Sequence, residues 1–283
     1  YIIGNVTSLQ HIEYSVNKIA GGAVEWQEVE NWTGSYTSRG KLIDRSTITN
    51  LLANELGWVT EKGVVNVISV DGTENNLMNV SKQKINIPAV AGGKSFDKYG
   101  NVLSQRIENS WYKDGGWSLE EIQRIYYESV TVSEGMLLDD EIGIDVTGYE
   151  VGEVVGPYDI HGRAIYSRVE SYNVVNKAEG SLQKTVHTLN HRFNSMGNVE
   201  DSISWTQVYV NGVQKTVETT QVHNEYDYSD ARLVAKGIAV RSASLVKRCV
   251  DSEGNYNASG SLAIIERNET ELAKDASGKY ILS

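Results

Sequence analysis

The chain has 283 residues, of which 37 are acidic and 26 are basic, so its formal charge is −11. A surface this acidic repels the phosphate backbone, and we therefore expect no nucleic-acid partner. With two prolines and a single cysteine, Cys249, the sequence excludes a Pro-rich linker and an internal disulfide.

The expected elements are mostly strands. The first exception along the chain is residues 46–56, where apolar positions at helical spacing after Ser46 predict a short helix that stops at Gly57. Residues 64–70 then read as a strand. Residues 111–117 surround Asp114-Gly115-Gly116 and read as a hairpin. Residues 118–126 are compatible with a second short helix or with the returning strand of that hairpin.

Apolar and polar residues alternate more regularly in the second half of the sequence. Residues 182–189 and 237–246 read as strands, because apolar and polar side chains take turns along them. Two alternating runs, 205–210 and 214–219, flank Asn211-Gly212, the dipeptide that most strongly predicts a tight hairpin. No run of about 18 apolar residues occurs, so we expect no membrane span.

A short pattern recurs along the chain: an aromatic residue, Asp or Asn, two free positions, Gly, a polar residue and an apolar residue. Its clearest copies begin at Phe96, Tyr158 and Phe193, and weaker copies begin at Tyr36, Val250 and Lys274. The polar and glycine positions of these copies are Gly40, Asp97 and Gly100, Asp159 and Gly162, Asn194 and Gly197, Asp251 and Gly254, and Asp275 and Gly278. Because Asp and Asn bond the backbone two residues on and Gly permits positive φ, each copy predicts a tight turn between strands.

This pattern resembles the YD repeat of the Rhs family, in a degenerate form that extends over most of the chain. The resemblance implies hairpin repeats that pair edge to edge into long twisted sheets, in large secreted or surface-exposed proteins. Some members enclose a toxin and others are surface or filament proteins. The spacing here is longer than the family's roughly twenty residues, so the β-repeat architecture is carried over and the toxin shell is not.

The sequence contains no catalytic constellation, and we predict no enzyme, no cofactor and no metal site. His187 and His191 lie four residues apart without the Cys or Glu that zinc motifs require. Residues 88–95 come close to a phosphate-binding loop, but Pro88 removes a cradling N–H and a turn follows where a helix is needed. The acidic run 139–145 matches no calcium loop and reads as a solvated turn.

The sequence therefore predicts an all-β fold: an extended array of irregular hairpin repeats over residues 1–283, with at most one or two short helices. The chain is either a whole subunit or a fragment of a longer protein. We expect a structural subunit of an extracellular filament or cell-surface fibre, whose partners are other copies of itself. The alternative is a carbohydrate- or ligand-binding β module of a surface protein. The residues expected to mediate self-association are the apolar ends of the chain, Tyr1, Ile2, Ile3, Tyr280, Ile281 and Leu282.

Overall fold

The computed structural model describes residues 9–35, 38–90, 93–138, 148–230, 233, 237–275 and 277–281. Over these residues the fold is nearly all β, which confirms the predicted class. Thirteen strands form one antiparallel sheet in the order β1-β2-β3-β4-β5-β6-β7-β10-β11-β12-β13-β14-β15, while β8 and β9 pair separately. The 3-10 turn η1, Glu134–Met136, is the one helical element longer than a single residue in the described ranges.

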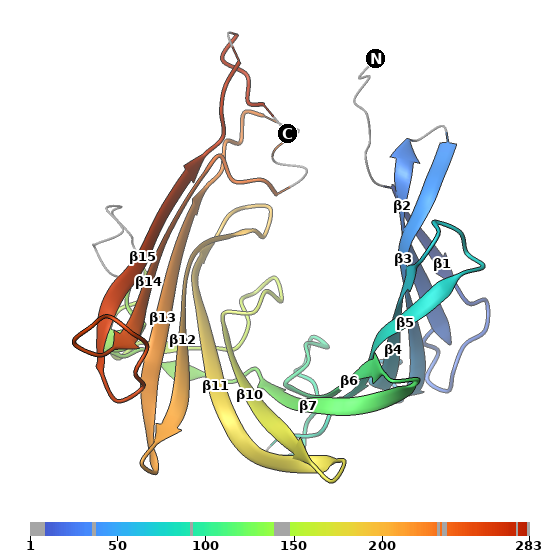
Figure 1. Ribbon diagram of the computed structural model, residues 1–283, viewed down its shortest axis with the longest axis horizontal. Helices are drawn as coiled ribbons and strands as arrows, with labels where there is room; N and C mark the ends of the chain where they lie inside the picture. The colour runs from blue at the N-terminus through green and yellow to red at the C-terminus, as the bar shows by residue number, and fades with distance from the viewer. Residues whose placement is uncertain are drawn as a thin grey trace. The chain divides into compact units, whose positions relative to one another are not determined.

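The chain divides into two compact units, which are described in turn. Unit 1 comprises residues 1–125 and 171–182, and unit 2 comprises residues 126–170 and 183–283. The first seven strands are β1 (Leu9–Tyr14), β2 (Trp26–Ser35), β3 (Ser38–Ala53), β4 (Val59–Ser69), β5 (Leu77–Asn86), β6 (Ser104–Lys113) and β7 (Gly116–Tyr126). The others are β8 (Val130–Thr131), β9 (Val154–Val155), β10 (Tyr166–Val175), β11 (Ala178–Phe193), β12 (Val199–Val210), β13 (Val213–Glu225), β14 (Arg241–Val250) and β15 (Ser261–Glu271) (Figure 1).

The predicted helix at residues 46–56 is wrong, because most of this segment belongs to β3. The β-branched residues Thr47, Ile48 and Thr49 favour a strand, and Ile48 pairs with Val64 of β4. The register between β3 and β4 shifts between residues 50 and 52, so Leu51 is an extra residue in the strand. This bulge breaks the alternation and produces the apolar spacing that imitates a helix.

Residues 118–126 form the returning strand β7, so the helical alternative is wrong. The β6–β7 hairpin turns at Asp114 and Gly115, which both have positive φ (50° and 79°). The predicted Asn211-Gly212 turn has the same form, with φ of 53° and 80°. Such turns match the right-handed twist of the strands that they connect.

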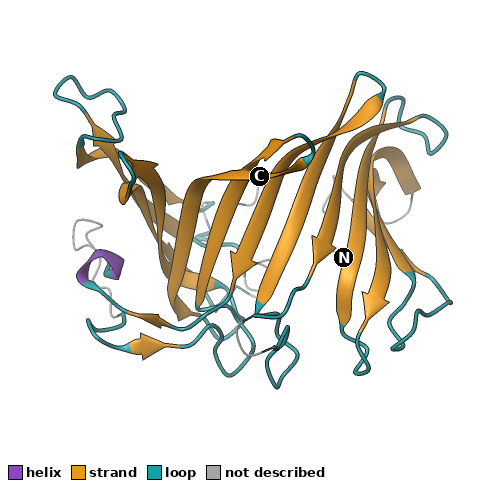
Figure 2. Cartoon of the chain, turned by 90° about the horizontal axis from the view of Figure 1, so that it is seen from below, coloured by secondary structure: helices purple, strands orange, loops and turns teal. Residues whose placement is uncertain are grey.

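The core of unit 2 lies on one face of its strands. Tyr166, Leu189 and Ile203 are buried there together with Trp205, and Val132 packs on them from the β8–β9 segment. This segment and the 3-10 turn stand apart from the main sheet in Figure 2. Burying each of these large apolar side chains contributes about 1.5–3 kcal/mol. The smaller core of unit 1 includes the buried side chains of Leu42, Ile85 and Ile122.

Candidate functional site

Five of the predicted repeat copies form the same backbone turn, and Asp97 illustrates it. Its N–H donates to the carbonyl of Asn101 (2.9 Å), and its Oδ1 accepts from the N–H groups of Tyr99 (2.8 Å) and Asn101 (2.9 Å). Gly100 donates back to the Asp97 carbonyl and has a φ of 90°. Burial raises the pKa of the Asp97 carboxyl, but hydrogen bonds from Asn101 and from backbone N–H groups outweigh it, so the pKa is lowered.

The other four copies repeat these contacts. Their glycines have φ between 77° and 90°, as the sequence predicts, and their Asp or Asn side chain accepts from the N–H groups two and four residues on. These copies are Asp159 with Gly162, Asn194 with Gly197, Asp251 with Gly254, and Asp275 with Gly278. The amide oxygen of Asn194 serves as well as a carboxylate, so the turn requires an acceptor rather than a charge.

The structure places Gly40 in a strand rather than at the positive-φ position of the predicted turn. Gly40 lies inside β3 and its φ is outside the left-handed region. A Cβ atom there would lie 2.4 Å from the carbonyl oxygen of Thr33, so glycine allows two strands to approach closely. This copy has Thr37 where the turn needs Asp or Asn, and Tyr36 and Thr37 lie outside the described residues.

One copy was missed by the sequence reasoning. Asn54 accepts from the N–H groups of Leu56 (3.0 Å) and Trp58 (2.9 Å), and Gly57 has a φ of 82°. This copy departs from the pattern twice, because Ala53 occupies the aromatic position and Trp58 occupies the polar position after the glycine. The Asn-x-x-Gly core alone could have identified it.

In each unit, turns from different strand connections pack against each other. In unit 1 the rings of Trp58 and Phe96 have centroids 5.1 Å apart, and a Cβ atom at Gly100 would lie 3.0 Å from the Trp58 ring. In unit 2 the Arg163 guanidinium lies 4.6 Å from the centre of the Phe193 ring and donates to the carbonyl of Asn194 (3.0 Å). The aromatic residue of the repeat therefore joins neighbouring turns laterally.

The residues expected to mediate self-association are only partly described. The backbones of Lys274 and Tyr280 form a bridge, and the N–H of Ile281 donates to the carbonyl of Ala273 (2.8 Å). Ile281 is half-exposed. Tyr1, Ile2, Ile3 and Leu282 lie outside the described residues.

The C-terminal outer strand, β15, offers a second candidate surface that the sequence reasoning did not identify. Among the strands that the structure describes, β15 pairs with β14 alone, and all eleven of its residues are exposed (Figure 1). Its first part carries Leu262 (42% exposed) and Ile264 (45%) and no charge. A bulge at Ile265 separates this part from the charged residues 266–271.

The strand β1 is at the opposite end of the sheet order, and β2 is its one partner among the described strands. Ile12 and Tyr14 on this strand are 41% and 57% exposed. Beside them, His11 contacts Glu13 (2.9 Å).

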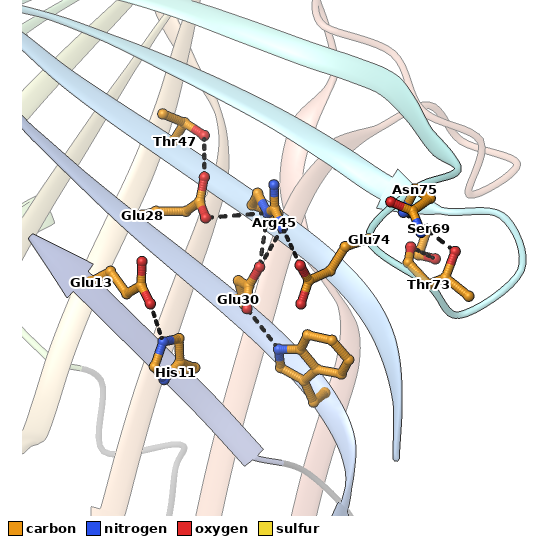
Figure 3. Close-up of polar contacts among 11 residues, drawn as sticks. His11, Glu13, Glu28, Glu30, Arg45, Thr47, Ser69, Thr73, Glu74 and Asn75 are labelled. Atoms are coloured by element: carbon orange, nitrogen blue, oxygen red, sulfur yellow. Dashed lines mark hydrogen bonds and ion pairs between the residues drawn. The ribbon is translucent and has the colours of Figure 1, made fainter. Parts of the chain in front are cut away.

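Beyond β1, three glutamates surround Arg45 of β3, two of them on β2 and one in the loop between β4 and β5 (Figure 3). Arg45 is 2.5 Å from Glu30, 3.4 Å from Glu28 and 3.8 Å from Glu74. Glu30 is buried and also accepts from the Trp32 indole N–H (2.9 Å). Three carboxylates therefore share one guanidinium, so this edge is negatively charged.

An aromatic hollow is present in unit 1, at the ends of β4–β7. It has a volume of about 550 Å³ and is lined by Ile68, Met78, Trp111, Tyr112 and polar neighbours that include Lys113 and Glu120. Trp111 is 47% exposed and Tyr112 is 37% exposed. Half-exposed aromatic rings beside polar groups are typical of sites that hold amphipathic ligands.

The two histidines singled out from the sequence have separate structural roles. His187 lies 2.6 Å from the Tyr166 hydroxyl and 3.0 Å from the Gln207 side chain, and burial lowers its pKa. Burial also lowers the pKa of His191, whose Nε2 contacts the carbonyl of Met136 (2.9 Å). The same burial raises the pKa of Tyr166 to about 12.

A buried ion cluster in unit 2 was not anticipated. Asp201 is fully buried, with its carboxylate 2.5 Å from His223 Nδ1 and 2.8 Å from Arg192 Nε. Such a cluster stabilises the local packing only while every member is present. In the described part of the chain, no group of three or more His, Cys, Asp and Glu side chains has the arrangement of metal ligands. The acidic run 139–145 lies outside that part.

No protein-family model matches this sequence, and no curated protein matches it. Within the described ranges, no helix has the length and apolar character needed to cross a membrane. The open strand edges and the aromatic hollow are therefore the candidate functional surfaces of the described residues.

Proposed function

We propose that this chain is a structural β module that self-associates through the open edges of its sheet, as a subunit of an extracellular filament or cell-surface fibre. The YD-like repeat supports this proposal, because that resemblance implies secreted or surface-exposed proteins built from paired repeats. The other copies of the chain are its partners, and its role is mechanical rather than catalytic.

The observation that supports the proposal most strongly is the uncharged first part of β15. Natural proteins protect outer strands with charged side chains, Pro or bulges, since unpaired N–H and C=O groups otherwise recruit another strand. Here the bulge at Ile265 and the charges of residues 266–271 protect only the second part. Leu262 and Ile264 are left next to open backbone hydrogen-bonding groups, which favours strand addition at this place.

Sedimentation velocity over a range of concentrations tests the proposal. The chain should sediment increasingly as dimers and larger species, whereas Ile264→Lys should weaken association at least about tenfold, the effect of about 1.4 kcal/mol. Val213→Lys is the matched control, because Val213 is exposed (69%) but lies on β13, which has a neighbour on both sides. A chain that stays monomeric at all concentrations, or an Ile264→Lys variant that behaves like the control, would overturn the proposal.

The aromatic hollow of unit 1 supports a second candidate, carbohydrate binding. A pyranose ring has an apolar face of C–H groups that packs on a half-exposed ring such as Trp111, while its hydroxyls bond to groups such as Lys113 and Glu120. Carbohydrate binding is measured by titrating the protein with a panel of soluble oligosaccharides and recording its tryptophan fluorescence. Binding that is lost in Trp111→Ala but kept in Trp26→Phe would establish it, and an unchanged spectrum with every sugar would reject it.

A further inference from the structure

The open edges of the two outer strands can be compared through the direction of their backbone groups. In an antiparallel pair, successive residues of a strand direct their N–H and C=O alternately toward the neighbour and away from it. One backbone hydrogen bond per strand therefore fixes which residues face outward. The outward residues are the only ones that can bond a newly added strand.

In β1 the even-numbered residues face outward. The N–H of Ser15 donates to the carbonyl of Trp26 (2.9 Å), and Ser15 continues the register in which Glu13 pairs with Glu28. The odd-numbered residues of β1 therefore bond β2. Gln10, Ile12 and Tyr14 direct their backbone groups away from the sheet.

In β15 the bulge changes which residues face outward. The N–H of Leu272 donates to the carbonyl of Val240 (2.9 Å), which makes Val246 and Glu266 a bonded pair in the same register. Beyond the bulge, Lys247 pairs with Ile264, so that pair is not hydrogen-bonded. Ile264 and, two residues earlier, Leu262 consequently face outward.

The outward residues of both edges are also their exposed apolar residues. An antiparallel alignment that places Ile12 opposite Ile264 also places Tyr14 opposite Leu262. Each of these side chains is between 40% and 57% exposed. The alignment satisfies open backbone groups on both strands and buries four apolar side chains, two contributions that act together.

The distribution of charged residues also favours pairing of β1 with the first part of β15. Glu13 lies between Ile12 and Tyr14, and Arg45 with its three glutamates lies beyond β1. Residues 266–271 carry three glutamates and one arginine, so they repel this edge. In the alignment described above, Glu13 lies opposite Ala263, within the uncharged part of β15.

We propose that β1 of one copy adds to β15 of the next copy as an antiparallel strand, with Ile12 opposite Ile264 and Tyr14 opposite Leu262. This inference rests on the proposed self-association and specifies its geometry. The contact is heterologous, because a different edge of each copy takes part, so the same contact can be repeated from one copy to the next. It also pairs both edges of every interior copy, whereas pairing β15 with β15 would leave β1 open.

Cysteine cross-linking tests the alignment. In this alignment Glu13 of one copy lies directly opposite Ala263 of the next copy, as a non-hydrogen-bonded pair. The Cα atoms of such a pair lie about 4.5 Å apart, within the range for a disulfide. Two singly substituted chains, Glu13→Cys and Ala263→Cys, are made with Cys249→Ala, since Cys249 is the chain's own thiol. Both substituted positions are exposed, and circular dichroism confirms that each variant remains folded.

After mild oxidation, only the mixture of the two variants should form a disulfide-linked dimer. A mixture of Glu13→Cys with Arg267→Cys, which the alignment does not place together, serves as the register control. Two outcomes overturn the inference while leaving self-association intact: no cross-link in the mixture although sedimentation shows association, or a cross-link of Ala263→Cys with itself, which indicates β15–β15 pairing. Absence of association in sedimentation rejects the proposed function as well.

Discussion

The ring of Trp58 packs against the ring of Phe96 at a centroid distance of 5.1 Å, and so joins two turns that belong to different strand connections. Trp58 follows the Asn54 turn and Phe96 precedes the Asp97 turn. The recurring aromatic position therefore contributes a contact between repeats, and the Asp-x-x-Gly positions contribute the turn itself.

Removing this contact should destabilise unit 1. We expect Phe96→Ala to lower the free energy of unfolding by about 2 kcal/mol, less than for a fully buried ring, because Phe96 is partly exposed. Tyr99→Ala is the control, since Tyr99 lies in the same turn but is 73% exposed. Urea denaturation of both variants measures the difference, and equal midpoints would contradict the role of the ring contact.

Gly100 combines positive φ with a tight contact, and Gly115 separates the two effects. Both glycines have positive φ, but a Cβ atom meets the Trp58 ring at Gly100 and no atom within 4 Å at Gly115. Gly115→Ala should cost about 1 kcal/mol from backbone strain alone. Gly100→Ala should cost more in the same urea assay, and a smaller cost would show that the turns do not pack as described.

At the first polar position of the repeat, a hydrogen-bond acceptor should matter more for stability than a negative charge. Asp97→Asn should cost clearly less than Asp97→Ala, because Asn54 and Asn194 make the same backbone contacts with an amide oxygen, and only the hydrogen bond from the Asn101 side chain (2.8 Å) is lost. Asp97→Ala should cost about 1 kcal/mol through the lost hydrogen bonds. If Asp97→Asn costs as much as Asp97→Ala in thermal unfolding, the charge of the carboxylate is required and this account of the turn is wrong.

Unit 2 should lose stability in mild acid. The pKa values of His187 and His191 are lowered by burial, so the unfolded chain takes up protons at these side chains before the folded chain does. Their contribution is fully present above about pH 6.5, the usual histidine value, and is lost as the pH falls through the lowered values. Urea midpoints at pH 7.5 and pH 5 measure the effect, which His187→Gln should reduce. An unchanged midpoint between these pH values would contradict it.

The local features of the fold could be predicted from the sequence, because short-range chemistry determines them. Asp-x-x-Gly and Asn211-Gly212 specify turns whatever the surroundings, and the copies at Asp97, Asp159, Asn194, Asp251 and Asp275 all form. The failure at residues 46–56 has a non-local cause: the bulge at Leu51 depends on the register with β4. The copy at Asn54 was missed because Ala53 and Trp58 both depart from the pattern.

The candidate interaction surface could not be predicted in the same way. Whether a strand is central or outermost depends on which other strands pair with it, and the alternation of β15 resembles that of the inner strands. The apolar residues Leu262 and Ile264 read as core positions until the sheet order shows that β15 has one neighbour. The sequence reasoning expected association through the ends of the chain and therefore did not consider this strand.

Self-association through the outer edge of β15 is tested by hydrogen exchange at the backbone amides of this strand, measured at several protein concentrations. We expect the amides of Leu262 and Ile264, which face outward, to exchange more slowly as the protein concentration rises. The exchange rate of the Gly212 amide, in its exposed hairpin turn, should stay the same. Exchange at Leu262 and Ile264 that is fast and independent of concentration would contradict self-association through this edge.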